Sequence, residues 1–443
     1  GDHACRLHAV LPALEMAGAD PTGAIRAHFA GDSRYAGAVA AMDRAAAVER
    51  GRLSPAAVET LYGRSYRMSA SRIDKLGSCH FAYFMEYGLR AKERTPAGFD
   101  AAQVGTFLHY VLEHVTREAV ARGGFAQLAE GELQQLIGQV IERYMAAAMP
   151  GFQERDARFR YLFRRLRRTV TAIVENVAQE LAVSDFVPMA FELAFGGEDG
   201  DLPALTIRAP EASLTLTGKV DRVDGWIRDG KLYLRVVDYK SGKKTFDLAD
   251  IRCGLNIQML LYLFALEREG EGLFGRPVVP AGVLYLPARD VMLSMDRSAG
   301  PEEIRAALDR ELRRSGLVLG EPEVLRAMEH SALESPRFLP LTLGRDGSIT
   351  KGIAAAGQLG KLGRYVDEIL KRAAEDLAGG NIDADPRGRS ETDCACTYCE
   401  FASACHFGQG GADDRLELIR PVTAAEFWDH VDKTIGEEER LWR

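Results

Sequence analysis

The sequence lacks a long hydrophobic run. Its most apolar stretch, residues 257–266, is roughly half of the ~20 residues that a membrane-spanning helix needs. No basic and apolar leader opens the chain, so no secretory signal is visible. An initiator Met is also absent, and we expect the chain to be a piece of a longer polypeptide. These absences argue against a membrane-spanning protein and give no sign of secretion.

Extremes of composition are absent as well. The chain has 443 residues, of which 47% are hydrophobic and 27% charged, with a net charge of −8. This balance excludes collagen-like, low-complexity and wholly disordered proteins. A net acidic chain is not a simple DNA-coating protein, although it can still contain a locally basic groove. No G-x-x-x-x-G-K-[ST] loop is present, so this chain should not hydrolyse ATP by itself.

Hydrophobic periodicity predicts a mixed α/β core with helical additions. Helices are expected within 1–66, then at 69–88, 101–121, 132–148, 158–183, 255–267, 301–315 and 353–376. Strands are expected at 186–195, 212–223, 231–239 and 281–286, with Asp229-Gly230 as a hairpin turn. We divide the chain into a helical segment that ends an upstream region, a main domain and a tail, at 1–66, 67–410 and 411–443.

The densest chemical signal lies on the predicted hairpin. One strand contains Gly-Lys-Val-Asp ending at Asp221, and the next contains Asp238 and Lys240 in V-V-D-Y-K-S-G. Because side chains alternate along a strand, Asp238 and Lys240 point the same way, and Asp221 can sit opposite them. Carboxylate oxygens suit Mg²⁺ or Mn²⁺, and a lysine beside the metal can orient an attacking water. The alternative is an exposed hairpin with ordinary ion pairs.

Two helices and one strand carry further polar groups. His109 and Glu113 lie one turn apart on a predicted helix, and Gln258 and Tyr262 share the face of another. Each of these residues could instead have a purely structural role in its helix. Glu192, on the first predicted strand, is either a metal ligand or a solvent-facing residue.

In this order, the motifs resemble the RecB-type branch of the PD-(D/E)XK nucleases. The resemblance implies a restriction-endonuclease-like core, in which a central mixed sheet is flanked by helices, and metal-dependent hydrolysis of DNA phosphodiesters. It assigns His109, Asp221 and Asp238 to metal binding. The catalytic set that it implies is Asp221, Asp238, Lys240, Gln258 and Tyr262.

The seven cysteines are unevenly distributed. Four crowd together near the end of the chain, which favours a metal or cluster site in a reducing compartment over disulfides. Cys396, Cys399 and Cys405 follow a C-x₂-C-x₅-C pattern, and Cys79 is the best candidate for a fourth ligand. Zinc is one alternative occupant, and Cys394 could replace Cys396. The pattern resembles the iron–sulfur arrangement of AddB-type helicase–nuclease subunits, which implies a 4Fe–4S cluster that staples the two ends of the nuclease domain.

A basic stretch precedes the first predicted strand. Seven arginines fall within residues 155–168 and are interleaved with Phe159, Tyr161 and Phe163. Such a pattern suits contact with a phosphate backbone and stacking on bases. The residues that we predict to bind DNA are Arg160, Arg164, Arg165 and Arg168, and the alternative is a solvated basic helix face.

The AddB-type resemblance also implies a biological setting. It implies exonuclease action on single strands at broken DNA ends during recombinational repair, with an AddA-like helicase–nuclease subunit as partner, in the cytoplasm and without membrane attachment. Two alternatives stay open. One is a stand-alone Cas4-like iron–sulfur exonuclease, and the other is a catalytically silent nuclease fold kept as a DNA clamp.

Overall fold

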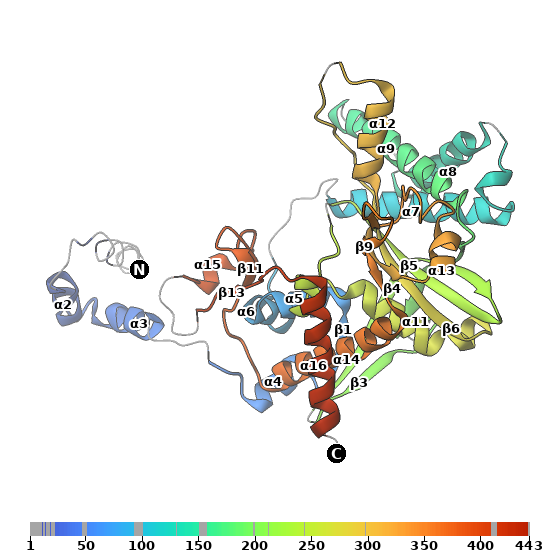
Figure 1. Ribbon diagram of the computed structural model, residues 1–443. Coiled ribbons are helices and arrows are strands. Elements are labelled where there is room, and N and C mark those ends of the chain that lie inside the picture. The colour runs from blue at the N-terminus through green and yellow to red at the C-terminus, as the bar shows by residue number, and fades with distance from the viewer. Residues whose placement is uncertain are drawn as a thin grey trace.

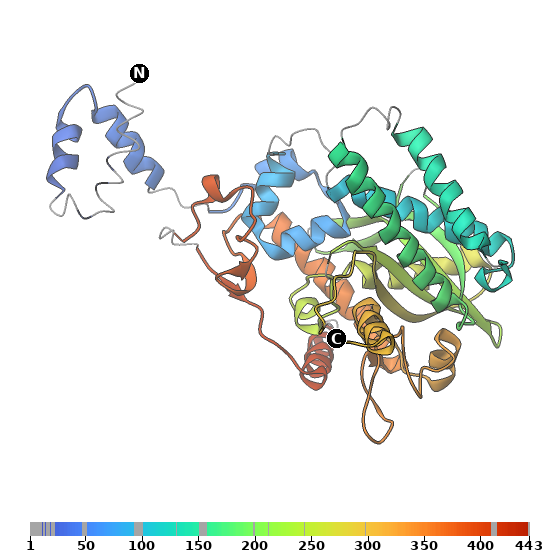
Figure 2. The same ribbon diagram turned by 90° about the horizontal axis from the view of Figure 1, so that it is seen from above.

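The computed structural model describes most of the chain. The described residues are 23–46, 51–92, 101–129, 131–149, 157–197, 200–210, 212–242, 244–296, 298–408 and 414–441, together with Leu11, Leu14 and Gly18. Near the N-terminus, α2 (Ala24–Gly31) and α3 (Ala36–Ala46) lie apart from the α/β body in both views (Figures 1 and 2). Val39 of α3 and Leu11 form a small core of their own there.

An eight-stranded mixed sheet forms the centre of the α/β body. Its strands are β1 (Ser65–Ser69), β2 (Val187–Phe195), β3 (Leu205–Arg208), β4 (Ser213–Arg228), β5 (Lys231–Lys240), β6 (Val278–Pro287), β7 (Ser315–Leu319) and β10 (Ile353–Ala354). The order across the sheet is β1-β4-β5-β6-β7-β10, and β2 and β3 also pair with β4. β4 and β5 are antiparallel and β5 and β6 are parallel. The mixed sheet predicted from the sequence is therefore confirmed.

The long strand β4 organises the sheet because it changes partners along its length. Its first part, Ser213–Thr217, pairs with β1 and β3. From Gly218 onward it pairs with β2, and from Arg222 onward also with β5. Asp221 therefore lies close to the point where β2, β4 and β5 meet.

Helices cover both faces of the sheet (Figures 1 and 2). On one side lie α7 (Ala101–Ala121), α8 (Glu132–Ala148) and α9 (Ala157–Leu181), and on the other α11 (Gln258–Phe274), α14 (Ala356–Ala378) and α16 (Ala424–Leu441). The other helices among the described residues are α4 (Pro55–Tyr62), α5 (Ala70–Ser78), α6 (His80–Tyr83), the π-helical turn η1 (Phe84–Gly88), the 3-10 turn η2 (Phe125–Gln127), α10 (Leu248–Arg252), α12 (Pro301–Leu312), α13 (Pro322–Met328) and α15 (Ala402–Cys405). The described residues also form two small sheets, one of β8 (Thr342–Leu343) and β9 (Ile349–Lys351), the other of β11 (Arg387–Ser390), β12 (Asp393–Cys394) and β13 (Glu417–Leu418). Among the described helices, none combines the length and the hydropathy that crossing a bilayer requires.

Several predicted elements differ from the observed ones. The helix predicted at 69–88 is broken at Cys79, whose φ of −173° is extended backbone, so Cys79 lies between α5 and α6 and not inside a helix. The strand β1 begins at Ser65, within the segment predicted to be helical, because it pairs with β4 in the main sheet. The strands β3 and β7 were not predicted, since both are short and are stabilised by distant neighbours.

The core extends past both predicted domain limits. Val58 and Tyr66, before residue 67, belong to the same buried cluster as Phe427 and Val431, which follow residue 410. The segments beside the main domain thus contribute to its packing. The functional division at 66 and 410 stays a prediction.

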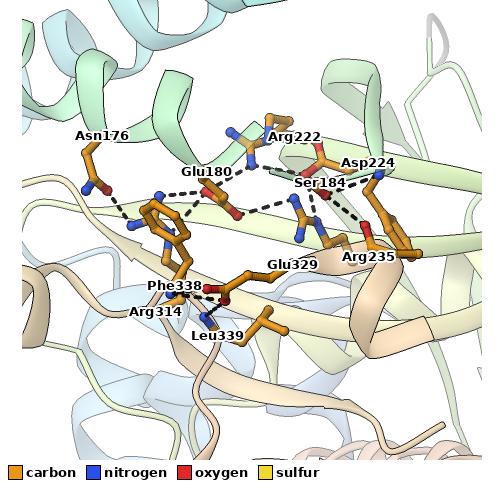
Figure 3. Close-up of polar contacts among 12 residues, drawn as sticks. Asn176, Glu180, Ser184, Arg222, Asp224, Arg235, Arg314, Glu329, Phe338 and Leu339 are labelled. Atoms are coloured by element: carbon orange, nitrogen blue, oxygen red, sulfur yellow. Dashed lines mark hydrogen bonds and ion pairs between the residues drawn. The ribbon is translucent and has the colours of Figure 1, made fainter. Parts of the chain in front are cut away.

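A buried ionic network joins α9 to the sheet (Figure 3). Glu180 of α9 lies 2.6 Å from an Nη of Arg314 and 3.2 Å from an Nη of Arg235, and Asp224 lies 2.9 Å from Nε of Arg235. Arg222 pairs with Asp224 at 2.8 Å and also donates to the hydroxyl of Tyr239 at 3.4 Å. Removing one member would leave a buried charge uncompensated. The network therefore ties α9 to β4 and β5, the two strands that carry Asp221 and Asp238.

Candidate active site and cysteine cluster

Two carboxylates meet on the β4–β5 hairpin. Asp221 accepts a hydrogen bond from the backbone N–H of Tyr239 at 2.8 Å, which holds it beside Asp238. Asp238 is only 3% exposed, and Oδ2 of this residue lies 2.8 Å from Nζ of Lys240. Burial, together with the charge of Asp221, raises the pKa of Asp238 to about 6, although Lys240 opposes the shift. A cation at this place would relieve the repulsion between the two carboxylates.

His109 of α7 faces the same carboxylates. Its Nδ1 lies 3.4 Å from Oδ1 of Asp221 and 3.9 Å from Oε1 of Glu192, and its Nε2 lies 3.2 Å from the carbonyl oxygen of Tyr239. Burial by itself lowers the pKa of His109, but the hydrogen bonds with Asp221 and Glu192 raise it by more than burial lowers it. The resulting pKa is about 10. One ligand atom from each of these three residues lies within 4.8 Å of the others, a donor set that fits one hard divalent cation.

Glu192 joins this group through an unusual backbone conformation. Its φ of 51° falls in the left-handed region that non-glycine residues rarely adopt, in the middle of β2. The neighbours Phe191 and Leu193 pair with Arg222 and Val220, so Glu192 lies across from Asp221. Such strain is typical of functional sites. The sequence left Glu192 open between ligand and solvent-facing residue, and the structure brings it into the ligand group.

Lys240 connects the carboxylates to α11. Besides its contact with Asp238, its Nζ donates to Oε1 of Gln258 at 3.5 Å, and Nε2 of Gln258 donates to the hydroxyl of Tyr262 at 3.0 Å. The ring of Tyr262 packs edge-on against Phe195 of β2, at 5.3 Å between centroids. The predicted lysine and the helical Q-x-x-x-Y pair therefore form one continuous chain of contacts. Glu113 is not part of it and pairs with Arg117.

Sequence reasoning missed Asn256, which sets the start of α11. Its φ of 57° is left-handed, and four contacts hold it there. Its N–H donates to Asp74 at 2.8 Å, its side-chain amide donates to Asp250 at 2.7 Å, and its side-chain oxygen accepts from Lys244. Its carbonyl accepts from the hydroxyl of Tyr285 at 3.4 Å. Because Gln258 follows two residues later, this arrangement positions the first turn of α11 so that Gln258 contacts Lys240.

The four predicted cluster ligands line one apolar pocket. Cys79, Cys396, Cys399 and Cys405 face it, together with Phe81, Phe407 and small residues. The described cysteines form no disulfide bonds with one another, and Cys5 lies outside the described residues. Cys394 does not line this pocket, and its thiol donates to the carbonyl of Glu391 at 3.5 Å.

Burial raises the pKa of Cys79 to about 11, and burial with the neighbouring thiols raises that of Cys396 to about 12. Four sulfurs around one apolar pocket fit a thiolate-bound centre, either zinc or iron–sulfur.

Hydrogen bonds tie the two halves of this pocket together independently of the thiols. The N–H of His80 donates to Asp385 at 2.9 Å, and Nδ1 of His80 lies 2.6 Å from the second oxygen of that carboxylate. The N–H of Phe81 donates to the carbonyl of Asp383 at 2.9 Å. The segments around residues 80 and 384 are therefore held side by side by the protein itself.

The predicted DNA-binding arginines lie along α9. Arg164, Arg165 and Arg168 line a surface pocket with Tyr161 and Asp290, and Arg165 pairs with Asp290 at 2.6 Å. Arg160 is on the same helix but is not part of this lining, and Arg155 lies outside the described residues. Phe163 is buried against Phe107, so it cannot stack on bases, whereas Tyr161 is 60% exposed. One of the three aromatic residues predicted to stack on bases thus belongs to the core.

The fold and the hairpin site define a PD-(D/E)XK nuclease. The family model of the PD-(D/E)XK nuclease superfamily matches residues 67–406, and the chain belongs to this superfamily.

The chain is also similar to proteins named as the B subunit of an ATP-dependent helicase/deoxyribonuclease. The protein of that name from Acetivibrio thermocellus is 33% identical over 84% of this chain and 32% of its own length. That from Moorella thermoacetica is 35% identical over 80% of this chain and 31% of its own length. The chain spans about a third of the length of these curated relatives.

Proposed function

We propose that this chain is the nuclease region of an AddB-type subunit and hydrolyses phosphodiesters of single-stranded DNA at processed double-strand-break ends. The observation that carries the proposal is the convergence of His109, Glu192 and Asp221 beside Asp238 and Lys240. The relatives are named as part of a helicase/deoxyribonuclease, which supports DNA as the substrate and an AddA-like helicase–nuclease subunit as the partner. A cytoplasmic location and a role in recombinational repair belong to the same proposal.

The metal of this reaction is proposed to be Mg²⁺ or Mn²⁺, held by His109, Glu192, Asp221 and Asp238. A bound divalent cation supplies charge stabilisation for the pentacoordinate phosphate and its leaving oxygen. Lys240 orients the attacking water and offsets the developing negative charge. Asp238 and Gln258 hold the ammonium group in place, and Tyr262 orients Gln258. The arginines on α9 are proposed to bind the phosphate backbone of the substrate.

We further propose that Cys79, Cys396, Cys399 and Cys405 bind a 4Fe–4S cluster. Their common apolar pocket supports a single thiolate-bound centre, and the hydrogen bonds of His80 and Phe81 support a preformed site. The cluster would staple the start of the nuclease region to its end. Its role here is structural, since the pocket lies outside the contacts that join Lys240 to α11.

The test of the nuclease proposal is cleavage of end-labelled single-stranded and duplex DNA by the wild type and by Lys240→Ala, with anaerobically prepared protein. Loss of the lysine should reduce Mg²⁺-dependent cleavage by roughly 10²–10³-fold, because a preorganised positive charge is removed. DNA binding should be retained. Lys433→Ala is the matched control, since Lys433 is an exposed lysine paired with Asp429 on α16.

Two outcomes would contradict the proposal. Full cleavage by Lys240→Ala would show that the assigned site is wrong. A wild type that binds DNA but does not cleave it, with Mg²⁺ or Mn²⁺ and with the helicase partner present, would favour the DNA-clamp alternative.

A further inference from the structure

We propose that a second groove, formed by α4, β1, α5 and η1, binds the single strand that the nuclease site cleaves. Its lining includes Arg67, Arg72, Arg90, Tyr62 and Tyr87. We name it the β1 groove. This inference rests on the proposed nuclease function, and it adds a binding surface that lies beyond the metal ligands and apart from the α9 arginines.

The β1 groove is positively charged although the chain as a whole is acidic. Arg67, Arg72, Arg90 and Lys92 line it and are exposed. Arg67 donates to the carbonyl of Gly196 at 2.7 Å and Arg72 to the carbonyl of Arg67 at 3.1 Å, so both guanidinium groups are oriented by neutral partners. Glu86, the acidic residue of the lining, pairs with Lys75 at 2.8 Å. The groove therefore presents fixed positive charge to a polyanion.

Aromatic rings provide a stacking surface in the same groove. The ring of Tyr83 is buried between those of Tyr62 and Tyr87, at centroid distances of 5.8 and 5.0 Å. Tyr62 and Tyr87 are partly exposed, and the guanidinium of Arg72 lies 4.8 Å from the ring centroid of Tyr87. Basic side chains interleaved with half-exposed aromatics are typical of sequence-independent single-strand binding, because every base has a face that can stack.

The backbone that carries these groups is irregular. Tyr87 lies in the π-helical turn η1, and Arg90 has a left-handed φ of 56°. A Cβ on Gly88 would lie 2.8 Å from the hydroxyl of Tyr62, so the turn and that ring are closely fitted. π-helical turns and left-handed residues are costly and occur frequently at functional sites. Here they place Tyr87 and Arg90 on the lining of one groove.

The register of the sheet directs the β1 groove toward the carboxylates. Arg67 pairs with Thr215 and Ser69 with Thr217, and Asp221 lies further along the same strand β4. Because side chains alternate with a period of two, Arg67, Thr215, Thr217 and Asp221 share one face of the sheet. At about 3.3 Å per residue, Thr217 and Asp221 are roughly 13 Å apart. A strand bound in the groove can therefore continue over this face to the nuclease site.

The test measures the binding of fluorescent oligo-dT to the full chain in EDTA by fluorescence anisotropy, at several salt concentrations. The wild type is compared with the double variant Arg72→Glu/Arg90→Glu. We expect at least about tenfold weaker binding and a shallower salt dependence, since two phosphate contacts are lost. Arg345→Glu makes the same kind of charge change on the exposed turn between β8 and β9 and should bind as the wild type does. Tyr87→Leu should weaken binding several-fold, whereas Tyr87→Phe should not, because the ring is kept.

Equal binding by the double variant and the Arg345→Glu control would overturn the inference. So would equal binding by Tyr87→Leu and Tyr87→Phe, if the double variant fails to fold. Cleavage by the wild type is measured in parallel with Mg²⁺. Cleavage by the wild type with unaltered binding of the variants rejects the β1 groove and keeps the nuclease. Weakened binding of the variants, with no cleavage by the wild type even when the helicase partner is present, keeps the groove and rejects the nuclease.

Discussion

At the scale of single residues, Asp74 of α5 is a carboxyl group that contacts the start of α11. It accepts a hydrogen bond from the N–H of Asn256, the residue that sets the start of that helix. Burial raises the pKa of Asp74 to about 6, although Lys244 and two backbone hydrogen bonds oppose the shift. The folded protein therefore binds a proton at Asp74 more tightly than the unfolded chain does. Ionisation of this carboxyl at neutral pH reduces the free energy of unfolding.

Asp74→Asn should remove this pH-dependent loss of stability, because an amide does not ionise. The contact itself is kept, since the amide oxygen can still accept a hydrogen bond from the N–H of Asn256. As pH rises from the ordinary value of 3.8 to about 6, the folded chain holds more protons than the unfolded one, so stability falls over this window. From pH 5 to pH 7 the wild type should lose roughly 1 kcal/mol relative to the variant. Urea unfolding of both proteins at the two pH values measures this difference, and a difference independent of pH would contradict it.

At the scale of elements, β4 meets α11 at Gly218, the point where the strand changes partners. A Cβ there would lie 2.8 Å from Cζ of Phe195 and 2.8 Å from Cε1 of Tyr262. Glycine is needed at this position because β2 and α11 approach the strand so closely. The contact fixes the position of Tyr262 and, through it, the Gln258 amide that faces Lys240.

Gly218→Ala should therefore lower both stability and cleavage. Overpacking of this kind costs roughly 1–3 kcal/mol, and the displaced Tyr262 would no longer orient Gln258. Gly138→Ala in α8 is the control, because a Cβ there meets nothing within 4 Å and alanine favours a helix. Thermal unfolding and cleavage assays should show the loss in Gly218→Ala alone. Equal values for the two variants would show that the contact at Gly218 is unimportant.

At the scale of the whole molecule, the cysteine pocket joins a segment that comes early in the sequence of the α/β body to a segment that comes late in it. Cys79 precedes all but one strand of the main sheet, and Cys396, Cys399 and Cys405 follow the last of them. A cross-link that closes so long a loop removes much conformational entropy from the unfolded chain. The proposed cluster should therefore stabilise the entire sheet.

Cys405→Ser should abolish the visible absorbance of the anaerobically purified protein and lower its unfolding temperature by on the order of 5–10 °C. Cys394→Ser is the matched control, because Cys394 lies outside the pocket, and it should keep both properties. Absorption spectra, iron and zinc analysis and thermal unfolding measure the effect. A colourless wild type that contains zinc would replace the iron–sulfur proposal with a zinc staple.

The sequence by itself determined those features that depend on near neighbours in the chain. The helices predicted at 101–121 and 132–148 match α7 and α8, since hydrophobic periodicity is local information. The start of α4 is local as well, because Ser54 caps it and Pro55 is its first residue. The shared face of Asp238 and Lys240 likewise follows from the period of a strand, and their 2.8 Å contact agrees with it. Motif order and spacing were sufficient to indicate the superfamily.

Only the tertiary structure decided which distant residues join these motifs. Glu192 reaches the ligand group through the register of β2 on β4 and a left-handed φ, and neither is encoded in the residues next to it. Asn256 acquires its conformation from partners on α5, on α10 and at residue 244. Tyr62 and Arg90 line one groove together with residues of β1, a strand that pairs with the distant β4. Strand register and long-range burial are set by packing of the whole chain, so local patterns cannot specify them.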